Sequence, residues 1–192
     1  MGSVLVIGGG AAGLAAAIAA AECGDTVTVA EKMDRVGKKI LATGNGRCNL
    51  MNTGAPRYPG NAAFAANVLS QCGAEAQKAF WEHLGLRLRQ EEAGRVYPVS
   101  SQASSVLDAL RLQLTALHVR VVTGVSITAL NRESDGWTAL SADGQRFRAN
   151  RVIISGGGCA QPKLGSDGSA LRLLTNLGCP ATPFAPALTQ II

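Results

Sequence analysis

The sequence is poor in the residues that hold metals and build disulfide frameworks. It has two histidines and five cysteines among 192 residues. The cysteine number is odd, no two cysteines form a CxxC pair, and most lie in apolar or glycine-rich surroundings. This pattern argues against zinc and against a disulfide framework, and it favours a reducing compartment. We therefore expect a cytoplasmic protein with no metal site.

Aromatic residues are also scarce, at 4% of the chain, whereas there are 23 glycines and hydrophobic residues make up 47%. Few aromatics with many small apolar residues suit a layered α/β protein, because small residues let helices lie close to a sheet. The length is that of one domain, or one domain with appendages, and is enough to bury a core.

No dense basic block is present, although the net charge is +5. The thirteen arginines are scattered from Arg35 to Arg172. Nucleic-acid-binding proteins more often have a concentrated basic patch with aromatics that stack on bases. We therefore expect a small-molecule substrate and no nucleic-acid partner. A bound anionic small molecule explains the modest basic excess, and so does a solvated surface.

The uncharged segment 1–21 does not have the features of a signal peptide or a membrane span. No Lys or Arg precedes its apolar run, and three consecutive glycines interrupt it. A strand, a turn and a helix explain this segment better. We expect no membrane association.

The N-terminal part of the chain predicts a compact β-α-β unit. The run "SVLVI" at 3–7 is a short strand, and the alanine-rich stretch 11–23 predicts a helix buried against a sheet. The run "TVTVA" at 26–30 is a second strand, with Glu31 at its far end. The usual right-handed crossover makes the two strands parallel.

The turn between the first strand and the helix contains Gly8-x-Gly10-x-x-Gly13. The strand before it, the helix after it and the acidic residue beyond the second strand are the context of a dinucleotide-binding fingerprint. Gly8 makes the tight turn, Gly10 lets the backbone approach a pyrophosphate, and Gly13 lets the helix pack on the strand. Backbone N–H groups at the helix start favour the phosphates. We therefore predict a dinucleotide site at this turn.

Glu31 is placed where its carboxylate can accept hydrogen bonds from both hydroxyls of an adenosine ribose. A 2′-phosphate would be repelled there, which disfavours NADP at this site. The alternative is that the glycines merely permit tight packing and Glu31 is a solvated strand end.

The rest of the chain predicts a Rossmann-like α/β fold with a central parallel sheet, flanking helices and a three-stranded antiparallel meander. Asp-Gly pairs at 135–136 and 143–144 are hairpin signals, and they place the meander within 126–149. Segment 94–103 reads as a loop. Helical patterns cover 60–85, 104–117 (N-cap Ser104 or Ser105) and 168–177 (N-cap Ser166 or Asp167), and further strands are expected at 119–124 and 151–158.

Four motifs make the chain similar to a known family. They are "VIGGGAAGLAAA" at 6–17, "GKKILATGNGRCN" at 37–49, "GRVYPVSSQASSVLDAL" at 94–110 and "SGGGCAQPKLGSDG" at 155–168. Together with the order of predicted elements, they resemble the HI0933-like family of FAD-dependent oxidoreductases, which are two-dinucleotide-binding flavoproteins. The stretch 37–49 is the most specific of the four, and by itself it reads as a flexible, cationic loop.

The resemblance implies that this loop runs past an FAD cofactor toward the flavin. Lys39 and Arg47 would supply charge to the phosphates or to the reduced flavin, which is how a protein tunes such a cofactor. Lys32 would lie beside the ribose, and the main chain of Val125 would meet the adenine. Ser155 stands in a turn where the family usually has Thr. The candidate cofactor-binding residues are Gly8, Gly10, Ala11, Ala12, Gly13, Glu31, Lys32, Lys39, Gly44, Gly46, Arg47, Cys48, Val125, Ser155, Gly156 and Gly157.

Cys48 has no second cysteine nearby in the sequence, so it is expected to be a small buried residue rather than a redox thiol. Lys163 and Asp167 are also candidates for chemistry, but Asp167 is more simply explained as a helix N-cap. The sequence identifies no catalytic residue.

Family members are implied to be longer, with a middle domain inserted after the second glycine motif and a later segment that completes the flavin pocket. The chain ends in "PALTQII" at 186–192, an apolar run without a turn or a charged tail. We expect residues 1–192 to be the N-terminal part of the FAD-binding domain. The chain alone is expected to bind FAD more weakly and to be inactive.

The predicted parent protein is an FAD-dependent oxidoreductase, linked to NAD(P)H and acting on an unknown small molecule. The alternatives are an NAD-binding dehydrogenase and a non-catalytic nucleotide-binding module. A dehydrogenase would need a general acid–base, and neither His83 nor His118 lies in a recognisable motif.

Overall fold

The computed structural model describes residues 1–55, 58 and 61–184, so the terminal run at 186–192 lies outside the described residues. The chain forms two compact units. Unit 1 contains Met1–Lys39 and the chain from Leu114 onward, and unit 2 contains Ile40–Gln113. Among the described residues, unit 1 contains two sheets and unit 2 contains one.

Unit 1 contains a four-stranded parallel sheet in the order β10-β1-β2-β6. Ile7 pairs with Ala30 on one side and with Ile154 on the other, so three strands end at the same level. The predicted parallel pairing of the first two strands is confirmed. The strands are β1 (Ser3–Ile7), β2 (Thr26–Ala30), β6 (Arg120–Val122) and β10 (Arg151–Ile154).

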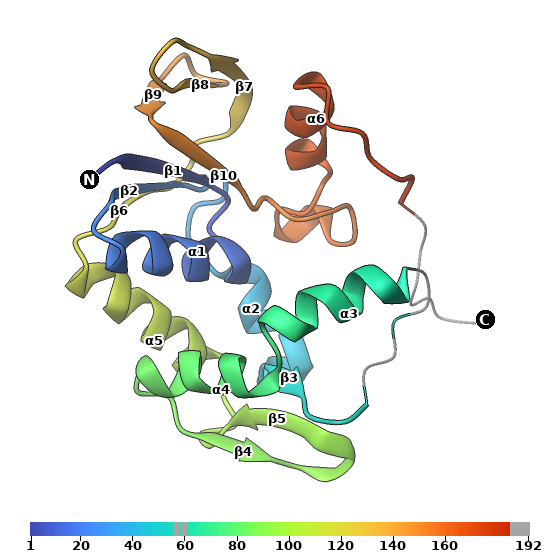
Figure 1. Ribbon diagram of the computed structural model, residues 1–192. Helices are drawn as coiled ribbons and strands as arrows, with labels where there is room; N and C mark the ends of the chain where they lie inside the picture. The colour runs from blue at the N-terminus through green and yellow to red at the C-terminus, as the bar shows by residue number, and fades with distance from the viewer. Residues whose placement is uncertain (56–57, 59–60, 185–192) are drawn as a thin grey trace. The chain divides into compact units, whose positions relative to one another are not determined.

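An antiparallel meander covers one face of this sheet, and helix α1 covers the other (Figure 1). Side chains alternate along β1, so Leu5 and Ile7 pack in one cluster with Ile127, Leu130 and Ala139 of the meander. The predicted meander is confirmed. Its strands are β7 (Ile127–Arg132), β8 (Trp137–Ser141) and β9 (Arg146–Ala149).

Helix α1 (Ala11–Glu22) buries one face rather than its whole surface. The buried residues are Gly13, Leu14, Ala17 and Ile18, whereas Ala11 and Ala12 are exposed. The prediction of a helix buried against a sheet is confirmed, and the burial is confined to the face that packs on the sheet. Alanine suits exposed helix positions as well as buried ones, because it is the best helix former.

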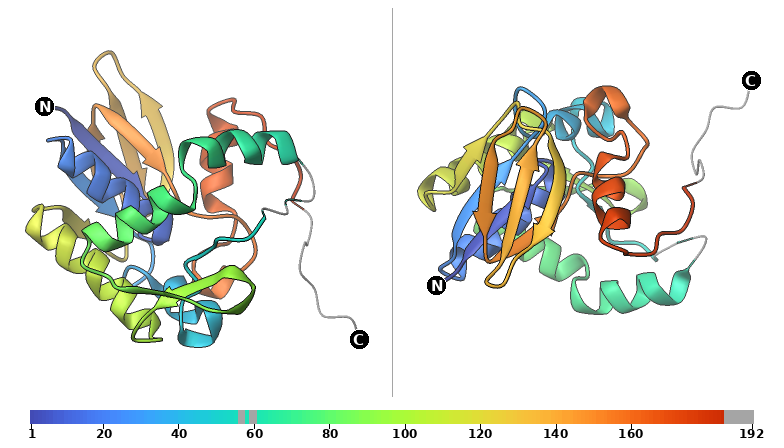
Figure 2. Two further views of the ribbon diagram at one scale, coloured as in Figure 1. Left: turned by 60° about the horizontal axis from the view of Figure 1, so that its bottom comes forward. Right: turned by 90° about the horizontal axis from the view of Figure 1, so that it is seen from above.

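Unit 2 contains a three-stranded antiparallel sheet in the order β3-β5-β4, with β4 and β5 visible as a hairpin (Figure 2). Segment 94–103 is therefore not simply a loop, because its Val96 and Tyr97 are buried in a strand. Val and Tyr favour strands, and Pro98 comes last in its strand, where proline is tolerated. The strands are β3 (Met51–Asn52), β4 (Leu88–Gln90) and β5 (Arg95–Pro98).

The helical pattern at 60–85 corresponds to two helices, which are separated at Gly73. Phe64 and Val68 of the first helix are exposed, so its apolar spacing does not mark a buried face within unit 2. Val106 and Leu110 are buried as the pattern at 104–117 predicts. Helices α3 (Ala62–Gln71) and α4 (Ala74–His83) lie in unit 2 and α6 (Ser169–Asn176) lies in unit 1, whereas α2 (Lys38–Ala42) and α5 (Ala103–Ala116) have residues in both units.

Two predicted helix caps are wrong. Helix α5 begins at Ala103, so Ser104 and Ser105 lie in its first turn. The N-cap of α6 is Gly168, which has a φ of 81°, a conformation that glycine adopts readily. Asp167 instead accepts a hydrogen bond from the Ser169 N–H at 3.0 Å. In the described ranges, no helix is both long enough and apolar enough to span a bilayer.

Candidate functional site

The first glycine turn packs as the motif predicts. Gly8 has a φ of 108°, and a Cβ there would lie 2.8 Å from the backbone of Gly156. A Cβ on Gly13 would lie 1.9 Å from the Gly8 carbonyl oxygen. The tight turn at Gly8 and the close approach of helix to strand at Gly13 are therefore confirmed.

The first backbone N–H groups of α1 have no partner within the helix. Gly10 is its N-cap and has no side-chain capping bond, and the first turn contains no acidic residue. The first intrahelical bond of this turn runs from Leu14 N to Gly10 O, so the N–H groups at 11–13 have no partner within the helix. A Cβ on Gly10 would meet no atom of the described residues within 4 Å. Open space thus lies beside donors that suit an anion.

A cavity of about 300 Å³ opens in unit 1 at the carboxyl ends of β1, β2 and β10. In an α/β sheet, ligands bind outside these strand ends. The cavity brings together most of the predicted cofactor-binding residues of unit 1. They are Gly8, Gly10, Ala11, Ala12, Glu31, Lys32, Lys39, Val125, Ser155, Gly156 and Gly157.

Sequence reasoning missed much of the opposite wall of this cavity. Leu164, Gly165, Ser166 and Ser169 line it, whereas the sequence predicts only a helix from 168 with Ser166 or Asp167 as its N-cap, and Lys163 and Asp167 as candidates for chemistry. The motif "SGGGCAQPKLGSDG" was the available signal, because it continues well beyond its three glycines. Other lining residues are Ile7, Gly9, Ala30, Met33, Arg35, Gly37, Lys38, Ser126, Ile127, Ala170 and Leu173.

Glu31 is buried and bonded to backbone on both sides. One carboxylate oxygen accepts the Gly9 N–H at 2.6 Å, and the other accepts the Met33 N–H at 2.7 Å. Glu31 is 8% exposed, so the alternative of a solvated strand end is wrong. Each carboxylate oxygen can accept more than one hydrogen bond, and Glu31 can therefore hold the loop and still accept from a ligand.

The two cavity lysines that were assigned to cofactor contacts also bond to protein. Lys32 Nζ lies 2.6 Å from Asp167 Oδ1 and 3.0 Å from Ser169 Oγ. The hydrogen bond from Lys32 is the main reason that the pKa of Asp167 lies well below its usual range. Lys39 donates a hydrogen bond to Ser166 Oγ. Both lysines therefore join the loop after β2 to the segment before α6.

Ser155 links the two glycine turns of unit 1. Its backbone N–H donates to Ile7 O at 2.8 Å, and its hydroxyl lies 3.0 Å from both Ile7 O and Gly8 O. A Cβ on Gly156 would meet Ala170 Cβ at 2.8 Å, so the second turn packs closely on α6. The Ser155 hydroxyl is thus engaged with the first turn.

The remaining predicted residues lie in unit 2. The stretch 37–49, expected to be a flexible loop, contains helix α2 and a short 3-10 helix, Thr43–Gly46. Gly44 and Gly46 have φ values of 56° and 81°, and a Cβ on Gly44 would lie 3.4 Å from the Tyr97 ring. Their proposed contact with a flavin stays a prediction.

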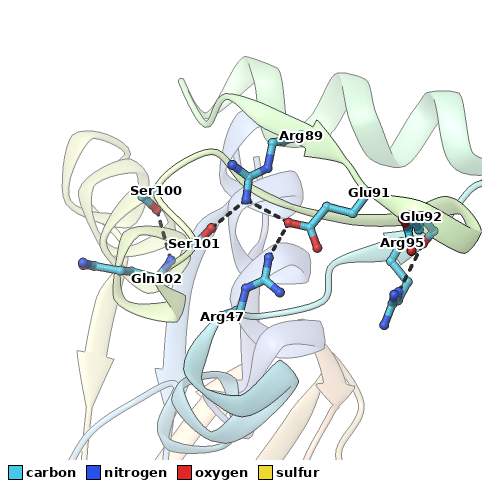
Figure 3. Close-up of polar contacts among 8 residues, drawn as sticks. All are labelled: Arg47, Arg89, Glu91, Glu92, Arg95, Ser100, Ser101 and Gln102. Atoms are coloured by element: carbon cyan, nitrogen blue, oxygen red, sulfur yellow. Dashed lines mark hydrogen bonds and ion pairs between the residues drawn. The ribbon is translucent and has the colours of Figure 1, made fainter.

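Arg47 is fixed by the sheet of unit 2 (Figure 3). Its guanidinium pairs with Glu91 and lies 4.1 Å from the centre of the Tyr97 ring. Arg89 reaches the same Glu91 oxygen at 2.8 Å and Ser101 Oγ at 3.0 Å. Hydrogen bonds from Arg47 and then Arg89 lower the pKa of Glu91. The charge of Arg47 is therefore partly compensated, and its orientation is set by Glu91 and Tyr97.

Cys48 is buried, as expected for a small packing residue. Burial raises the pKa of its thiol, so the thiol is protonated near neutral pH and is a weak nucleophile. Across the part of the chain that the structure describes, no group of three or more His, Cys, Asp or Glu side chains could hold a metal ion.

Comparison with known proteins connects this geometry to a family. Residues 2–185 match the model of the HI0933-like protein Rossmann domain. The chain is 46% identical over 196 residues to 3-dehydro-bile acid delta(4,6)-reductase of Clostridium scindens, an alignment that covers the whole chain and 47% of that protein. It is 24% identical over 191 residues to ribosomal RNA dihydrouridine synthase of Haemophilus influenzae, covering 93% of the chain and 46% of that protein.

Solved structures share the fold. The 3-ketosteroid-delta4-(5alpha)-dehydrogenase of Rhodococcus jostii RHA1 matches 92% of the chain, and 54% of its own, with a TM-score of 0.71 and 17% identity. A flavocytochrome c3 fumarate reductase matches 92% of the chain, and 40% of its own, with a TM-score of 0.66 and 16% identity. The chain spans about half the length of the curated relatives it matches. Because the model of the HI0933-like protein Rossmann domain covers nearly all of its residues, the chain belongs to the HI0933-like family.

Proposed function

We propose that this chain is the FAD-binding part of a flavin-dependent oxidoreductase that acts on a small molecule. One observation carries the proposal: the uncapped N-terminus of α1 and the buried carboxylate of Glu31 face the same cavity. The first suits a pyrophosphate and the second suits the ribose beside it. An adenine dinucleotide carries both groups at a fixed spacing.

The residues present fit FAD. Gly10 leaves open the space that a side chain would occupy, so a phosphate can approach the N–H groups of the first turn. Val125 donates its N–H to Glu31 O at 2.9 Å, which leaves its carbonyl as the main-chain group to meet the adenine. Bound FAD would supply the transfer of hydride or electrons, and the role of these residues is to bind and orient it.

Charge in the cavity supports an anionic ligand. Lys39 and Arg35 line it, and in the described ranges neither pairs with a carboxylate. Lys32 and Lys38, in contrast, are paired with Asp167 and Asp34. Lys39 and Arg35 are therefore the cavity cations with charge to offer to the phosphates.

The substrate class rests on a relative. The Clostridium scindens protein, at 46% identity, is by name a reductase of 3-dehydro-bile acids. We propose that the parent of this chain likewise reduces a small organic substrate, with NADH or NADPH as the electron donor. The ribosomal RNA dihydrouridine synthase of Haemophilus influenzae is only 24% identical, and the scattered arginines favour a small molecule over RNA. The proposal includes flavin contacts from Gly44, Gly46, Arg47 and Cys48, which the family resemblance supports.

A titration of the purified chain with FAD tests the cofactor. Binding should perturb the visible absorption of FAD and quench its fluorescence, and ADP should compete for the site. Gly10→Ala should weaken FAD binding at least tenfold with an unchanged thermal midpoint, because the added Cβ points into open space. An NAD-binding domain would bind NAD in preference to FAD. If neither FAD nor ADP binds, or if Gly10→Ala binds FAD as the unchanged chain does, the proposal is wrong.

A second measurement concerns activity. We expect FAD bound to this chain alone to be reduced by NADH or NADPH slowly or not at all. The reason is that the family resemblance implies a further segment of the parent protein that completes the flavin pocket. Stopped-flow absorption under anaerobic conditions follows this reduction. Rapid reduction and turnover by the 192-residue chain would contradict this part of the proposal.

A further inference from the structure

The segment 161–169 forms a wall of the cavity in unit 1. It folds back on itself through an antiparallel bridge between Gln161 and Ser166, and it turns at Gly165, which has a φ of 96°. Leu164, Gly165, Ser166 and Ser169 line the cavity, whereas Asp167 does not. Asp167 therefore acts on the cavity only through the residues it contacts.

Lysine side chains hold this wall from the other side of the cavity. Lys32 reaches Asp167 and Ser169, and Lys39 donates to Ser166 Oγ. The backbone is close as well, because a Cβ on Gly165 would lie 3.3 Å from Met33 Cγ and 3.5 Å from Lys32 Cε. Both lysines follow β2, and Lys32 and Asp167 are 135 residues apart in sequence. The wall is thus fixed by tertiary contacts at its end nearest to α6.

Asp167 has two partners that determine its position. Its Oδ1 lies 2.6 Å from Lys32 Nζ and accepts the Ser169 N–H at 3.0 Å. The ion pair is partly exposed, with side-chain exposures of 21% for Lys32 and 42% for Asp167. It commits Lys32 to the wall, so that Lys32 is not a free cation for the ligand. A contact of this kind is weak enough to open on the timescale of ligand release.

We propose that Asp167 is a positioning residue which, through Lys32, holds the 161–169 wall closed over the bound dinucleotide and slows its release. The inference rests on the proposed function, since it takes FAD as the molecule in the cavity. The ion pair must open before the wall can move away from the loop after β2. Its loss should therefore raise the dissociation rate and change the association rate little.

Stopped-flow fluorescence measures release of FAD from the preloaded chain after mixing with excess ADP. For Asp167→Asn, we expect the dissociation rate to rise about threefold to fivefold, the size of effect that a partly exposed ion pair can have. The association rate should change less than twofold. The ratio of variant to unchanged rate should approach one at high salt, because salt screens the ion pair.

Matched variants distinguish the loss of the Lys32–Asp167 pair from a non-specific loss of stability. Asp25→Asn removes a carboxylate of the same unit that lies 3.7 Å from Arg151 and does not line the cavity, and it should leave FAD release unchanged. Lys32→Met should release FAD as fast as Asp167→Asn, whereas Lys32→Arg keeps the pair and should restore slow release. The double variant Lys32→Met/Asp167→Asn should be no faster than either single variant, because both remove the same contact.

The outcomes distinguish the inference from the proposed function. If the chain binds FAD and Asp167→Asn releases it at the unchanged rate, the inference is wrong and the proposed function stands. Slower release would show that Lys32, once freed, binds the ligand itself, and would also overturn the inference. If FAD does not bind to the unchanged chain, both fail. If circular dichroism shows that Asp167→Asn does not fold, the FAD dissociation rates of Lys32→Met and Lys32→Arg test the inference instead. Equal rates for these two variants would overturn it.

Discussion

Two glycine turns follow neighbouring parallel strands of unit 1, and they differ in what fixes them. The first turn follows β1 and leads at once into α1. The second follows β10, and its chain continues through the 161–169 wall before α6 begins. Ile7 and Ile154 pair in register, so both turns start at the same edge of the sheet.

The difference lies in the atoms that each turn touches. At Gly13 the nearest atom to an added Cβ is a backbone oxygen of the same turn, Gly8 O. At Gly156 it is the side chain of Ala170, and at Gly157 it is the hydroxyl of Ser166. The first turn is therefore set mainly by backbone, its own at Gly13 and that of Gly156 at Gly8, and backbone cannot move aside. The second is set by side chains from later in the chain, and these can be changed.

Gly13→Ala should have the largest effect. Its Cβ would lie 1.9 Å from Gly8 O, and no side-chain movement can relieve that contact. We expect the free energy of unfolding to fall by roughly 4 kcal/mol or more, as for other severe backbone clashes. Urea unfolding followed by circular dichroism measures it. Gly10→Ala, three positions earlier, is the control and should be as stable as the unchanged chain. A stable Gly13→Ala variant would refute the view that backbone sets the first turn.

Gly156→Ala should have an intermediate effect, because its clash is with the Cβ of Ala170 at 2.8 Å. Overpacking of this kind typically costs about 1–3 kcal/mol of unfolding free energy. The double variant Gly156→Ala/Ala170→Gly should recover part of that loss, since it removes the atom that clashes. Urea unfolding of the two single variants and the double variant gives the interaction free energy between positions 156 and 170. Additive losses would mean that side-chain packing does not set the second turn.

Ser155→Ala should cost less again. The serine hydroxyl lies within hydrogen-bonding distance of Ile7 O and Gly8 O, and a single such bond contributes about 1 kcal/mol to stability. Ser155→Thr keeps the hydroxyl and is the matched control. Thermal unfolding should show a lower midpoint for Ser155→Ala than for Ser155→Thr. Equal thermal midpoints for the two variants would show that the Ser155 hydroxyl does not stabilise the contact between the two turns.

The smallest effect concerns pH and the Lys32–Asp167 pair. Lys32, and then Ser169, lower the pKa of Asp167 from its ordinary value of 3.8. A carboxyl group whose pKa is lowered by folding stabilises the protein above its unfolded pKa, and this contribution is lost as the pH falls through the folded pKa. The difference in unfolding free energy between the unchanged chain and Asp167→Asn should be constant from about pH 5 to 8 and should shrink below about pH 4.

The size of that difference should stay below about 1 kcal/mol, because the pair is partly exposed and screened by solvent. Urea unfolding at several pH values measures it. A difference that grows toward low pH would contradict the assignment of the pKa shift to the Lys32 contact.

The parts of the fold that the sequence predicted are those with local signals. The β-α-β unit, the meander with its Asp-Gly turns and the buried face of α5 each follow from patterns within about 30 residues. The sheet of unit 2 escaped prediction because its strands have only two to four residues, too few to show alternation. Arg47 meets Glu91 across 44 positions, and no spacing rule joins them.

In the candidate site, too, features with local sequence signals were predicted and contacts between distant residues were not. The glycine motif and Glu31 were found from the sequence because a turn of fixed geometry needs glycine at fixed positions. That Glu31 bonds to the Gly9 N–H, and that Lys32 is committed to Asp167, could not be read from spacing. Both contacts depend on where the strand ends lie relative to one another.

The sequence by itself determined the first turn, its helix and the acidic residue that follows β2, because steric limits on backbone act between neighbours in the chain. Only the tertiary structure decided which side chains close the cavity from its other side. The 161–169 wall reaches the loop after β2 through side chains whose partners lie more than a hundred residues away, and those pairings exist only once the sheet has formed.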